Sequence, residues 1–323
     1  MKAVIAALGA GRMGRGIAHA FAYAGHEVLL VDLKERSAGE SACTASESIA
    51  QVRASLSRLA ELGAFDAAAI DPIMARVRFV PRHAAAAALP RADFAFEGVP
   101  EVMQAKRAAL AFACPLLGRD AVVASTTSSF LVTELCGMAR RPENFLSAHW
   151  LNPAYLIPLV ELAPHPGTAP QALARTQELL ESIGKMPVVC KPAPGYIVPR
   201  LQALVMSEAA RMVEEGVATP EDIDRAVRYG FGFRYANMGM LEFIDYGGVD
   251  ILWYAGSYMT QKLGDRFRPP PVVERLMREG KTGLRDGEGF YDWKLIDRDA
   301  WQREVLGRQL AMLRHLGLLK PPG

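Results

Sequence analysis

The chain has 323 residues, more than one hydrophobic core usually supports, so we expect two domains. Half of the residues are hydrophobic and 22% are charged, with a formal net charge of +2. This is the composition of a soluble globular protein, and the lack of any run of like charges argues against nucleic-acid and membrane partners. The expected partner is a small molecule.

The four cysteines, Cys43, Cys114, Cys136 and Cys190, have no CxxC spacing and lie in apolar or helical segments. We expect reduced thiols and no metal site, which favours a cytoplasmic location. The apolar run at 3–8 is too short for a secretory signal. Because no stretch reaches 18 consecutive apolar residues, no membrane span is expected.

A glycine motif follows the first expected strand. The run at 3–8 reads as a buried parallel strand, and it leads into Gly9-Ala10-Gly11-Arg12-Met13-Gly14, a G-x-G-x-x-G pattern. Gly9 permits a tight turn, Gly11 lets the backbone approach a pyrophosphate, and Gly14 lets a helix over 12–24 pack on the sheet. The helix N-terminus then faces the phosphates, which makes Gly9, Gly11, Arg12, Met13 and Gly14 the expected dinucleotide contacts.

An acid at the end of the second expected strand, 27–31, bears on the choice of dinucleotide. Asp32 lies 18 residues after Gly14, where a carboxylate accepts hydrogen bonds from the adenosine ribose and repels a 2′-phosphate. NAD is therefore favoured over NADP. Lys34 and Arg36 weaken this inference, since an Arg just past the strand can hold the extra phosphate. The alternative for the whole motif is a tight turn with chance glycines.

Helices and short apolar strands then alternate up to residue 189. We expect helices over 35–63, in an alanine-rich segment that stops at Pro90, from Pro100 to about 117, and over 170–183. Further strands are expected at 77–80, 93–97, 122–125 and 186–189. The alternation predicts an α/β domain, a Rossmann-type dinucleotide-binding domain over residues 1–192.

The second half of the chain has a different pattern. Lys-Pro-Ala-Pro-Gly at 191–195 is the best linker, and beyond it the periodicity is wholly helical. A helix is expected over 197–216, and Thr219 with Pro220 caps the next one. We therefore predict an all-helical C-terminal domain over 193–323.

A histidine and a glutamate lie on two short apolar strands within 147–162. The Glu161 carboxylate between Val160 and Leu162 would be costly to bury alone, and the nearest candidate partner in sequence is the imidazole of His149. Such a pair makes His149 a tuned proton acceptor. The alternative is a core histidine bonded to a carbonyl and a glutamate at a strand edge.

Four hydroxyl residues at 126–129 follow the strand at 122–125 directly. Ligands of open α/β sheets bind beyond the carboxyl ends of strands, so these side chains are candidates for substrate contact, with Ser128 foremost. Capping of the following helix, expected over 131–138, is the alternative.

Several sequence motifs of this chain resemble motifs of the L-3-hydroxyacyl-CoA dehydrogenase family and occur in the same order along the chain. They are Thr127-Ser128-Ser129, His149 through Asn152-Pro153 to Leu159-Val160-Glu161, Pro194-Gly195-Tyr196-Ile197-Val198, Glu221-Asp222-Ile223-Asp224 and Gly287-Glu288-Gly289-Phe290-Tyr291.

The resemblance implies an NAD-dependent oxidoreductase that acts on a CH–OH group. His149 matches the family's catalytic base, Glu161 its paired acid and Ser128 its substrate-positioning residue. A hydride leaves the alcohol carbon for the nicotinamide while the imidazole takes the hydroxyl proton. Glu161 fixes the imidazole tautomer and stabilises the imidazolium, and Ser128 holds the substrate oxygen. Lys106 is expected on the nicotinamide side of the coenzyme pocket, and Glu97, at the end of its strand, is expected to bind the coenzyme.

The sequence departs from the family where its motif has an Asn after Ile-Val. Here Pro199 follows Val198, and proline has neither a side-chain donor nor a backbone N–H. Polarisation of the carbonyl then falls to another residue, with Asn152 or Gln202 as candidates, or the substrate is oriented differently.

The stretch at 156–166 is closer in motif to the L-gulonate 3-dehydrogenase, lambda-crystallin and carnitine dehydrogenase branch, whose members act on free acids. Arg234 is a candidate carboxylate clamp, with a plain surface arginine as the alternative. The segment 35–63 has none of the lysines that thioester enzymes direct toward CoA. We therefore expect a small free 3-hydroxy acid as substrate and a homodimer formed through the C-terminal domain. The alternatives are 3-hydroxybutyryl-CoA dehydrogenase activity on the thioester, and an NAD-binding structural or sensing protein.

Overall fold

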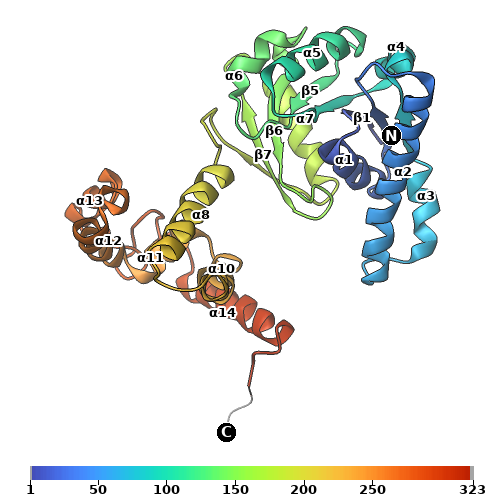
Figure 1. Cartoon of the computed structure of the whole chain (residues 1–323). Helices are drawn as coiled ribbons and strands as arrows, with labels where there is room; N and C mark the ends of the chain where they lie inside the picture. Colours follow the sequence, from blue (N-terminus) through green and yellow to red (C-terminus); the bar gives the residue numbers. More distant parts are fainter. Residues whose placement is uncertain (1, 321–323) are drawn as a thin grey trace. The chain divides into compact units, whose positions relative to one another are not determined.

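The computed structural model describes residues 2–320. The chain folds into two compact units, Met1–Met206 and Ser207–Gly323 (Figure 1). This division falls inside one helix, α8 (Val198–Glu214), which begins after the linker. The sequence boundary between residues 192 and 193 stays a prediction of where the domains are joined.

The first unit is built on one sheet, with eight strands among the described residues, in the order β3-β2-β1-β4-β5-β6-β7-β8. All neighbouring strands run parallel except β6 and β7, which pair antiparallel. The order from β3 to β6 is the doubly wound one of dinucleotide-binding folds, so the predicted Rossmann-type architecture is confirmed. The strands are β1 Val4–Leu8, β2 Glu27–Val31, β3 Val77–Val80, β4 Phe94–Glu97, β5 Val122–Ser125, β6 Phe145–Trp150, β7 Leu159–Pro164 and β8 Met186–Val189.

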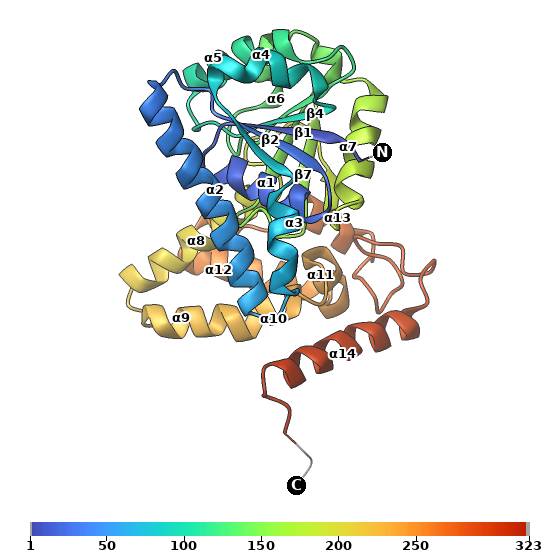
Figure 2. The ribbon, with the colours of Figure 1, turned by 90° about the vertical axis from the view of Figure 1, so that its right-hand side faces the viewer.

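Helices cover both faces of this sheet. Ile5 and Ala7 of β1 pack into a core with α1, α2, α3 and α7, whereas Ala6 and Leu8 pack into a second core with α4, α5 and α6. Figure 2 shows α4, α5 and α6 together on one side of the strands. Because successive side chains of a strand point to opposite faces, both faces of β1 must be apolar. The helices are α1 Arg12–Tyr23, α2 Ala38–Glu61, α3 Ile70–Met74, α4 Ala85–Ala88, α5 Met103–Ala113, α6 Val132–Leu135 and α7 Pro170–Glu181.

Several helix ends differ from the prediction. Helix α2 starts later than residue 35 because Ser37 caps it, with its hydroxyl accepting from the Glu40 N–H. Pro100 does not open a helix: α5 begins at Met103, after Val102 in extended conformation. The alanine-rich helix α4 ends at Ala88, shortly before Pro90 as expected, and Pro90 lies in the first turn of a 3₁₀ helix, where its missing N–H costs nothing. Short 3₁₀ helices occupy Ala67–Ala69, Arg82–Ala84, Leu89–Arg91, Cys114–Leu116, Cys136–Met138 and Pro142–Asn144.

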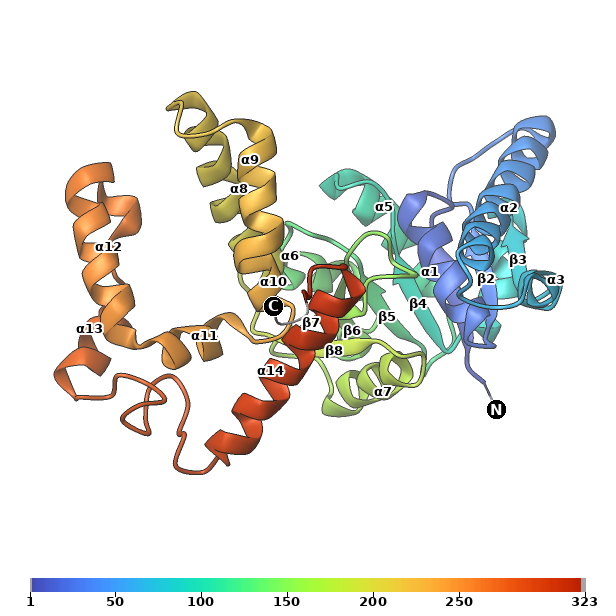
Figure 3. The ribbon, with the colours of Figure 1, turned by 90° about the horizontal axis from the view of Figure 1, so that it is seen from below.

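The second unit is helical, as predicted. Besides the end of α8, its described elements are α9 Pro220–Ala226, a π-helical turn Val227–Phe231, α10 Gly232–Tyr235, α11 Met240–Gly247, α12 Val249–Leu263, the 3₁₀ turn Asp265–Phe267, α13 Pro271–Arg278 and α14 Arg298–His315. Helices α12 and α13 pack through Val249, Val273 and Leu276 (Figure 3). Thr219 caps α9 and Pro220 lies in its first turn, which confirms the sequence signal.

The segment Gly287–Tyr291 packs against the buried Asp245 in the interior of this unit. The buried carboxylate of Asp245 accepts from the backbone N–H groups of Phe290 and Tyr291 and from the indole of Trp293, each at 2.9 Å. A Cβ on Gly289 would lie 2.3 Å from Asp245 Oδ1. Only glycine allows the backbone to come this close to the Asp245 carboxylate, so the segment Gly287–Tyr291 has a structural role.

None of the helices within residues 2–320 combines the length and the apolar character that a membrane span requires. The four cysteines lie unpaired in the structure.

Candidate active site

The glycine motif forms the turn between β1 and α1. Gly9 has φ 107°, in the left-handed region that favours glycine. A Cβ on Gly14 would lie 1.8 Å from the Gly9 carbonyl oxygen, so Gly14 must be glycine for the helix to pack here. By contrast, nothing lies within 4 Å of a Cβ built on Gly11, so the open backbone at this position fits the close approach of a pyrophosphate. Arg12 is exposed beside it and Met13 is half-buried.

Asp32 follows β2 and is 4% exposed. Its Oδ2 accepts from Arg36 Nε at 2.5 Å and its Oδ1 from the Lys34 N–H at 3.2 Å. Each carboxylate oxygen can accept more than one hydrogen bond, so Asp32 can still bind the ribose hydroxyls. The turn and this acid together fit a dinucleotide.

His149 and Glu161 lie directly opposite each other on the antiparallel strands β6 and β7. Opposed residues of such a pair project from the same face of the sheet. His149 Nδ1 lies 2.7 Å from Glu161 Oε2, and both residues are buried. The structure thus brings the predicted pair together.

The second oxygen of Glu161 fixes the carboxylate to the start of α8. Oε1 accepts from the N–H groups of Ile197 and Val198, both at 2.8 Å. Three donors therefore stabilise the buried carboxylate. Because a carboxylate can only accept, Nδ1 of His149 must donate, which places the lone pair of the neutral imidazole on Nε2.

Tyr196 supports the histidine, a contact that the sequence did not predict. Its ring is stacked on His149, with centroids 5.4 Å apart and an interplanar angle of 13°. Its hydroxyl lies 2.7 Å from Ser147 Oγ, and burial raises its pKa to about 12. The only sequence feature that could have indicated this contact is the position of Tyr196 in the Pro-Gly-Tyr-Ile-Val motif. Tyr196 has φ 44°, unusual for a residue other than glycine.

Ser128 lies on the loop after β5, near the edge where β6 brings His149. Ser125 pairs with Ser147 in the parallel ladder, so residues just beyond each emerge at the same end of the sheet. Ser128 is exposed, and its N–H donates to Glu101 Oε1 at 3.0 Å. The side-chain role of Ser128 stays a prediction.

Glu101 is a residue that sequence reasoning missed. Its Oε1 also accepts from the Thr127 hydroxyl at 2.5 Å and from the Ser129 N–H at 2.9 Å, so one carboxylate holds the whole loop. Burial raises the pKa of Glu101, but these bonds and the Lys106 ammonium outweigh burial and lower it to about 2. The sequence feature that could have indicated Glu101 is its position between the two predicted coenzyme residues Glu97 and Lys106.

Glu97 and Lys106 form a buried ion pair. Lys106 Nζ lies 3.1 Å from Glu97 Oε1 and 3.2 Å from Glu101 Oε2, and neither Glu97 nor Lys106 is exposed. Ser125 Oγ donates to Glu97 Oε2 at 2.6 Å. Glu97 and Lys106 thus connect β4, β5 and α5, and a direct contact of either with the coenzyme stays a prediction.

Asn152 is exposed after β6 and precedes a cis peptide bond to Pro153. It lines a cavity of about 340 Å³ together with Arg12, Arg15, Gly16, Gln51, Val52, Ser55, Pro153, Ala154 and Tyr155. The predicted substrate residue Asn152 and the predicted coenzyme residue Arg12 therefore border one space. Two guanidinium groups in its lining make this space suitable for an anion.

Arg234 belongs to the second unit. It lies on α10, is exposed, and its guanidinium is 5.2 Å from the centre of the Phe243 ring. It lines a cavity of about 160 Å³ with residues of α11 and α14. Its carboxylate-clamp role stays a prediction.

Pro199 fits its place in α8. It is the second residue of that helix, where a backbone N–H has no acceptor within the helix, so its lack of a donor costs no helical hydrogen bond. Gln202, one of the two candidates for polarising the carbonyl, is exposed on the same helix.

Two family models match the chain one after the other, up to residue 293. The 3-hydroxyacyl-CoA dehydrogenase NAD binding domain matches residues 4–193, and the C-terminal domain of the same family matches residues 195–293. The chain belongs to the 3-hydroxyacyl-CoA dehydrogenase family. Members of this family share the NAD-binding domain, and accordingly the chain is an NAD-dependent oxidoreductase acting on a hydroxyl group.

Individual relatives align over most of the chain. A 5-formyl-3-hydroxy-2-methylpyridine 4-carboxylate 5-dehydrogenase from Mesorhizobium japonicum is 33% identical over 315 residues, 97% of each protein. The mitochondrial hydroxyacyl-coenzyme A dehydrogenase of Sus scrofa is 32% identical over 292 residues, 90% of this chain and 91% of that enzyme. The crystal structure of a 3-hydroxyacyl-CoA dehydrogenase from Archaeoglobus fulgidus matches with a TM-score of 0.75 and 30% identity, covering 98% of this chain and all of that one.

Proposed function

We propose that this dehydrogenase oxidises the 3-hydroxyl group of a small free 3-hydroxy acid to the 3-keto product. The main support for this reaction is the His149–Glu161 pair, in which Nδ1 and Oε2 are 2.7 Å apart. Nε2 of His149 takes the hydroxyl proton, and Glu161 stabilises the imidazolium that forms. NAD, when bound, accepts the hydride that leaves the alcohol carbon. The electron pair left on oxygen becomes the carbonyl bond.

Ser128 is proposed to position the substrate oxygen. The Glu101 carboxylate fixes its backbone through the Ser128 N–H, which leaves its hydroxyl to bind a ligand. Such positioning lowers the barrier by holding the reacting groups in line.

Two observations support a free acid over a thioester. Helix α2 carries no lysine along its 24 residues. The name of the Mesorhizobium japonicum relative describes a carboxylate without CoA. Arg234 is a further proposed substrate contact.

The CoA thioester remains the second candidate, because the name of the Sus scrofa relative describes a hydroxyacyl-coenzyme A substrate. The two candidates separate in one assay: the purified protein is incubated with NAD and a panel of free 3-hydroxy acids and 3-hydroxyacyl-CoA thioesters, and NADH absorbance is followed. We expect turnover of free acids. Turnover of thioesters alone would reject the free-acid proposal, and NAD binding without any turnover would favour a structural or sensing protein.

We also propose a cytoplasmic homodimer formed through residues 193–323. Ile251, Tyr254 and Tyr258 of α12 are each more than 60% exposed and recur at helical spacing on one face. Exposed apolar and aromatic side chains on one helix face favour a protein contact. Light scattering of the purified protein should give twice the chain mass. The free thiols agree with a reducing compartment.

A further inference from the structure

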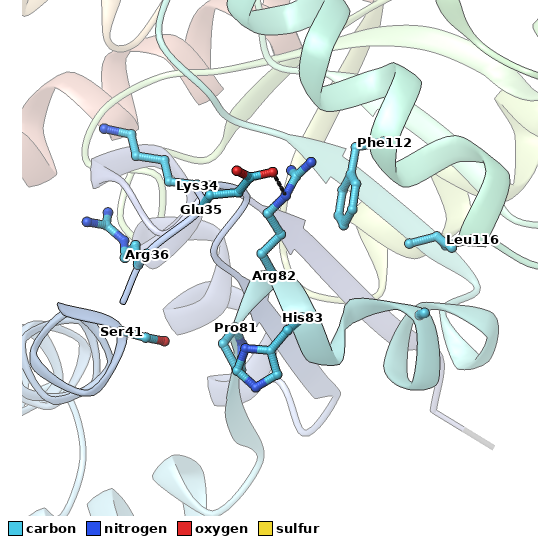
Figure 4. A pocket seen from close by; sticks show the side chains of 10 residues that line it. Lys34, Glu35, Arg36, Ser41, Pro81, Arg82, His83, Phe112 and Leu116 are labelled. Atoms are coloured by element: carbon cyan, nitrogen blue, oxygen red, sulfur yellow. Dashed lines mark ion pairs between the residues drawn. The ribbon is translucent and has the colours of Figure 1, made fainter. Parts of the chain in front are cut away.

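A cavity lies close to Asp32, outside the catalytic pair. Its volume is about 420 Å³, and it is lined by Lys34, Glu35, Arg36, Ser41, Pro81, Arg82, His83, Ala86, Phe112 and Leu116. These residues follow β2 and β3 or come from α2, α4, α5 and the 3₁₀ turn after α5 (Figure 4). Asp32 at the end of β2 is the ribose-binding position of the fold, so this cavity adjoins the adenosine end of the coenzyme.

The carboxylate that should exclude a 2′-phosphate is neutralised. Arg36 Nε donates to Asp32 Oδ2 at 2.5 Å, with the Asp32 side chain 6% and the Arg36 side chain 26% exposed. A paired carboxylate repels a nearby anion much less than an isolated one at the same distance. Arg36 uses one nitrogen in this bond, and its two Nη groups are further donors.

The other wall of the cavity supplies an anchored cation. The Arg82 guanidinium lies 3.8 Å from the centre of the Phe112 ring, and Nη1 donates to the Leu33 carbonyl at 2.7 Å. Its contact with Glu35 is longer, 3.5 Å, and the Glu35 side chain is 86% exposed (Figure 4). An exposed pair of this kind is weak, so a phosphate can replace Glu35 at low cost.

We propose that this cavity is a 2′-phosphate site, so that the chain binds NADP as well as NAD. Arg36 moves from Asp32 to the phosphate when NADP is bound, and it returns to Asp32 when NAD is bound. Lys34 and Arg82 add positive charge, and Ser41 in the first turn of α2 adds a hydroxyl donor. Cationic side chains outnumber the acidic ones here, which suits a dianion.

Two small probes test the site without any turnover. Adenosine 5′-monophosphate and adenosine 2′,5′-bisphosphate differ only in the 2′-phosphate, and titration calorimetry gives a dissociation constant for each. In the unaltered protein we expect the bisphosphate to bind no more than about tenfold more weakly than the monophosphate. A larger discrimination against the bisphosphate would overturn the proposal.

Substitutions then assign the effect to Arg36. Arg36→Ala should weaken the bisphosphate at least about tenfold and the monophosphate less than about threefold, as expected for loss of a charge-assisted bond. Arg53→Ala removes the same charge from the outer surface of α2, where Arg53 pairs with Asp71, and should change neither constant. An equal change for both probes in Arg36→Ala would contradict a phosphate-specific role.

A second variant tests the same site in case Arg36→Ala does not fold. Asp32→Asn keeps the shape of the side chain but removes its charge, and should raise the affinity for the bisphosphate relative to the monophosphate about tenfold. An unchanged ratio would also count against the site. Failure here leaves the dehydrogenase proposal intact, since that proposal is tested by NADH formation from hydroxy acids.

Discussion

His149 and Glu161 face each other across the antiparallel junction of β6 and β7, with Nδ1 and Oε2 2.7 Å apart. The other carboxylate oxygen is bound by two backbone N–H groups at the start of α8. The base is therefore held in one tautomer by a carboxylate that is itself fixed, and Tyr196 packs on the imidazole ring.

His149→Ala removes the proposed base and should lower kcat by about two to four orders of magnitude, the usual contribution of general base catalysis. Steady-state NADH formation measures it. His315 is exposed on α14, so His315→Ala is the matched control and should keep normal activity. Near-normal kcat in His149→Ala would remove His149 from the base role.

Glu161→Gln tests the tautomer argument. The amide has one acceptor oxygen where three donors converge, so one donor is left unsatisfied or Nδ1 loses its proton to Nε2. We expect kcat to fall by about two to four orders of magnitude and the free energy of unfolding by about 1–3 kcal/mol. Kinetics and urea unfolding give the two values. An unchanged kcat would show that the carboxylate does not control the base.

Two alanine substitutions in the glycine turn should have separate effects. Gly14→Ala forces a Cβ against the Gly9 carbonyl oxygen and should destabilise the fold by about 1–3 kcal/mol. Gly11→Ala meets no protein atom and should leave stability nearly unchanged, yet weaken NAD binding at least about tenfold. Thermal unfolding and NAD titration distinguish them. Normal NAD affinity in Gly11→Ala would argue against pyrophosphate contact there.

Protonation of the buried His19 should lower the stability of the folded protein in mild acid. Burial, with a smaller effect from the Lys185 charge, lowers its pKa from 6.5 to about 4. The unfolded chain therefore takes up a proton at higher pH than the folded one. This contribution to stability is complete above pH 6.5, is lost as pH falls toward 4, and amounts to about 3 kcal/mol at most.

The comparison variant is His19→Phe, which keeps a ring against Tyr155, where His19 now stacks at 4.2 Å. Urea unfolding of both proteins between pH 7 and 4 should show the wild-type advantage shrinking as pH falls. A difference that does not change with pH would mean that His19 titrates alike in both states.

The sequence by itself determined the local parts of this molecule. The glycine spacing predicts the turn after β1, because the left-handed φ of Gly9 and the contact between Gly14 and Gly9 depend on residues close in the chain. Apolar strands alternating with helices predict the α/β unit, since side-chain period follows directly from backbone conformation. The cost of burying Glu161 alone predicted its partner.

Only the tertiary structure decided which distant groups meet. The sheet register sets His149 opposite Glu161, and the start of α8 brings two N–H donors to the same carboxylate. Glu101 reaches across to the loop after β5. Such contacts depend on packing between elements and on rotamers chosen in that packing, and neither hydrophobic periodicity nor motif spacing encodes them.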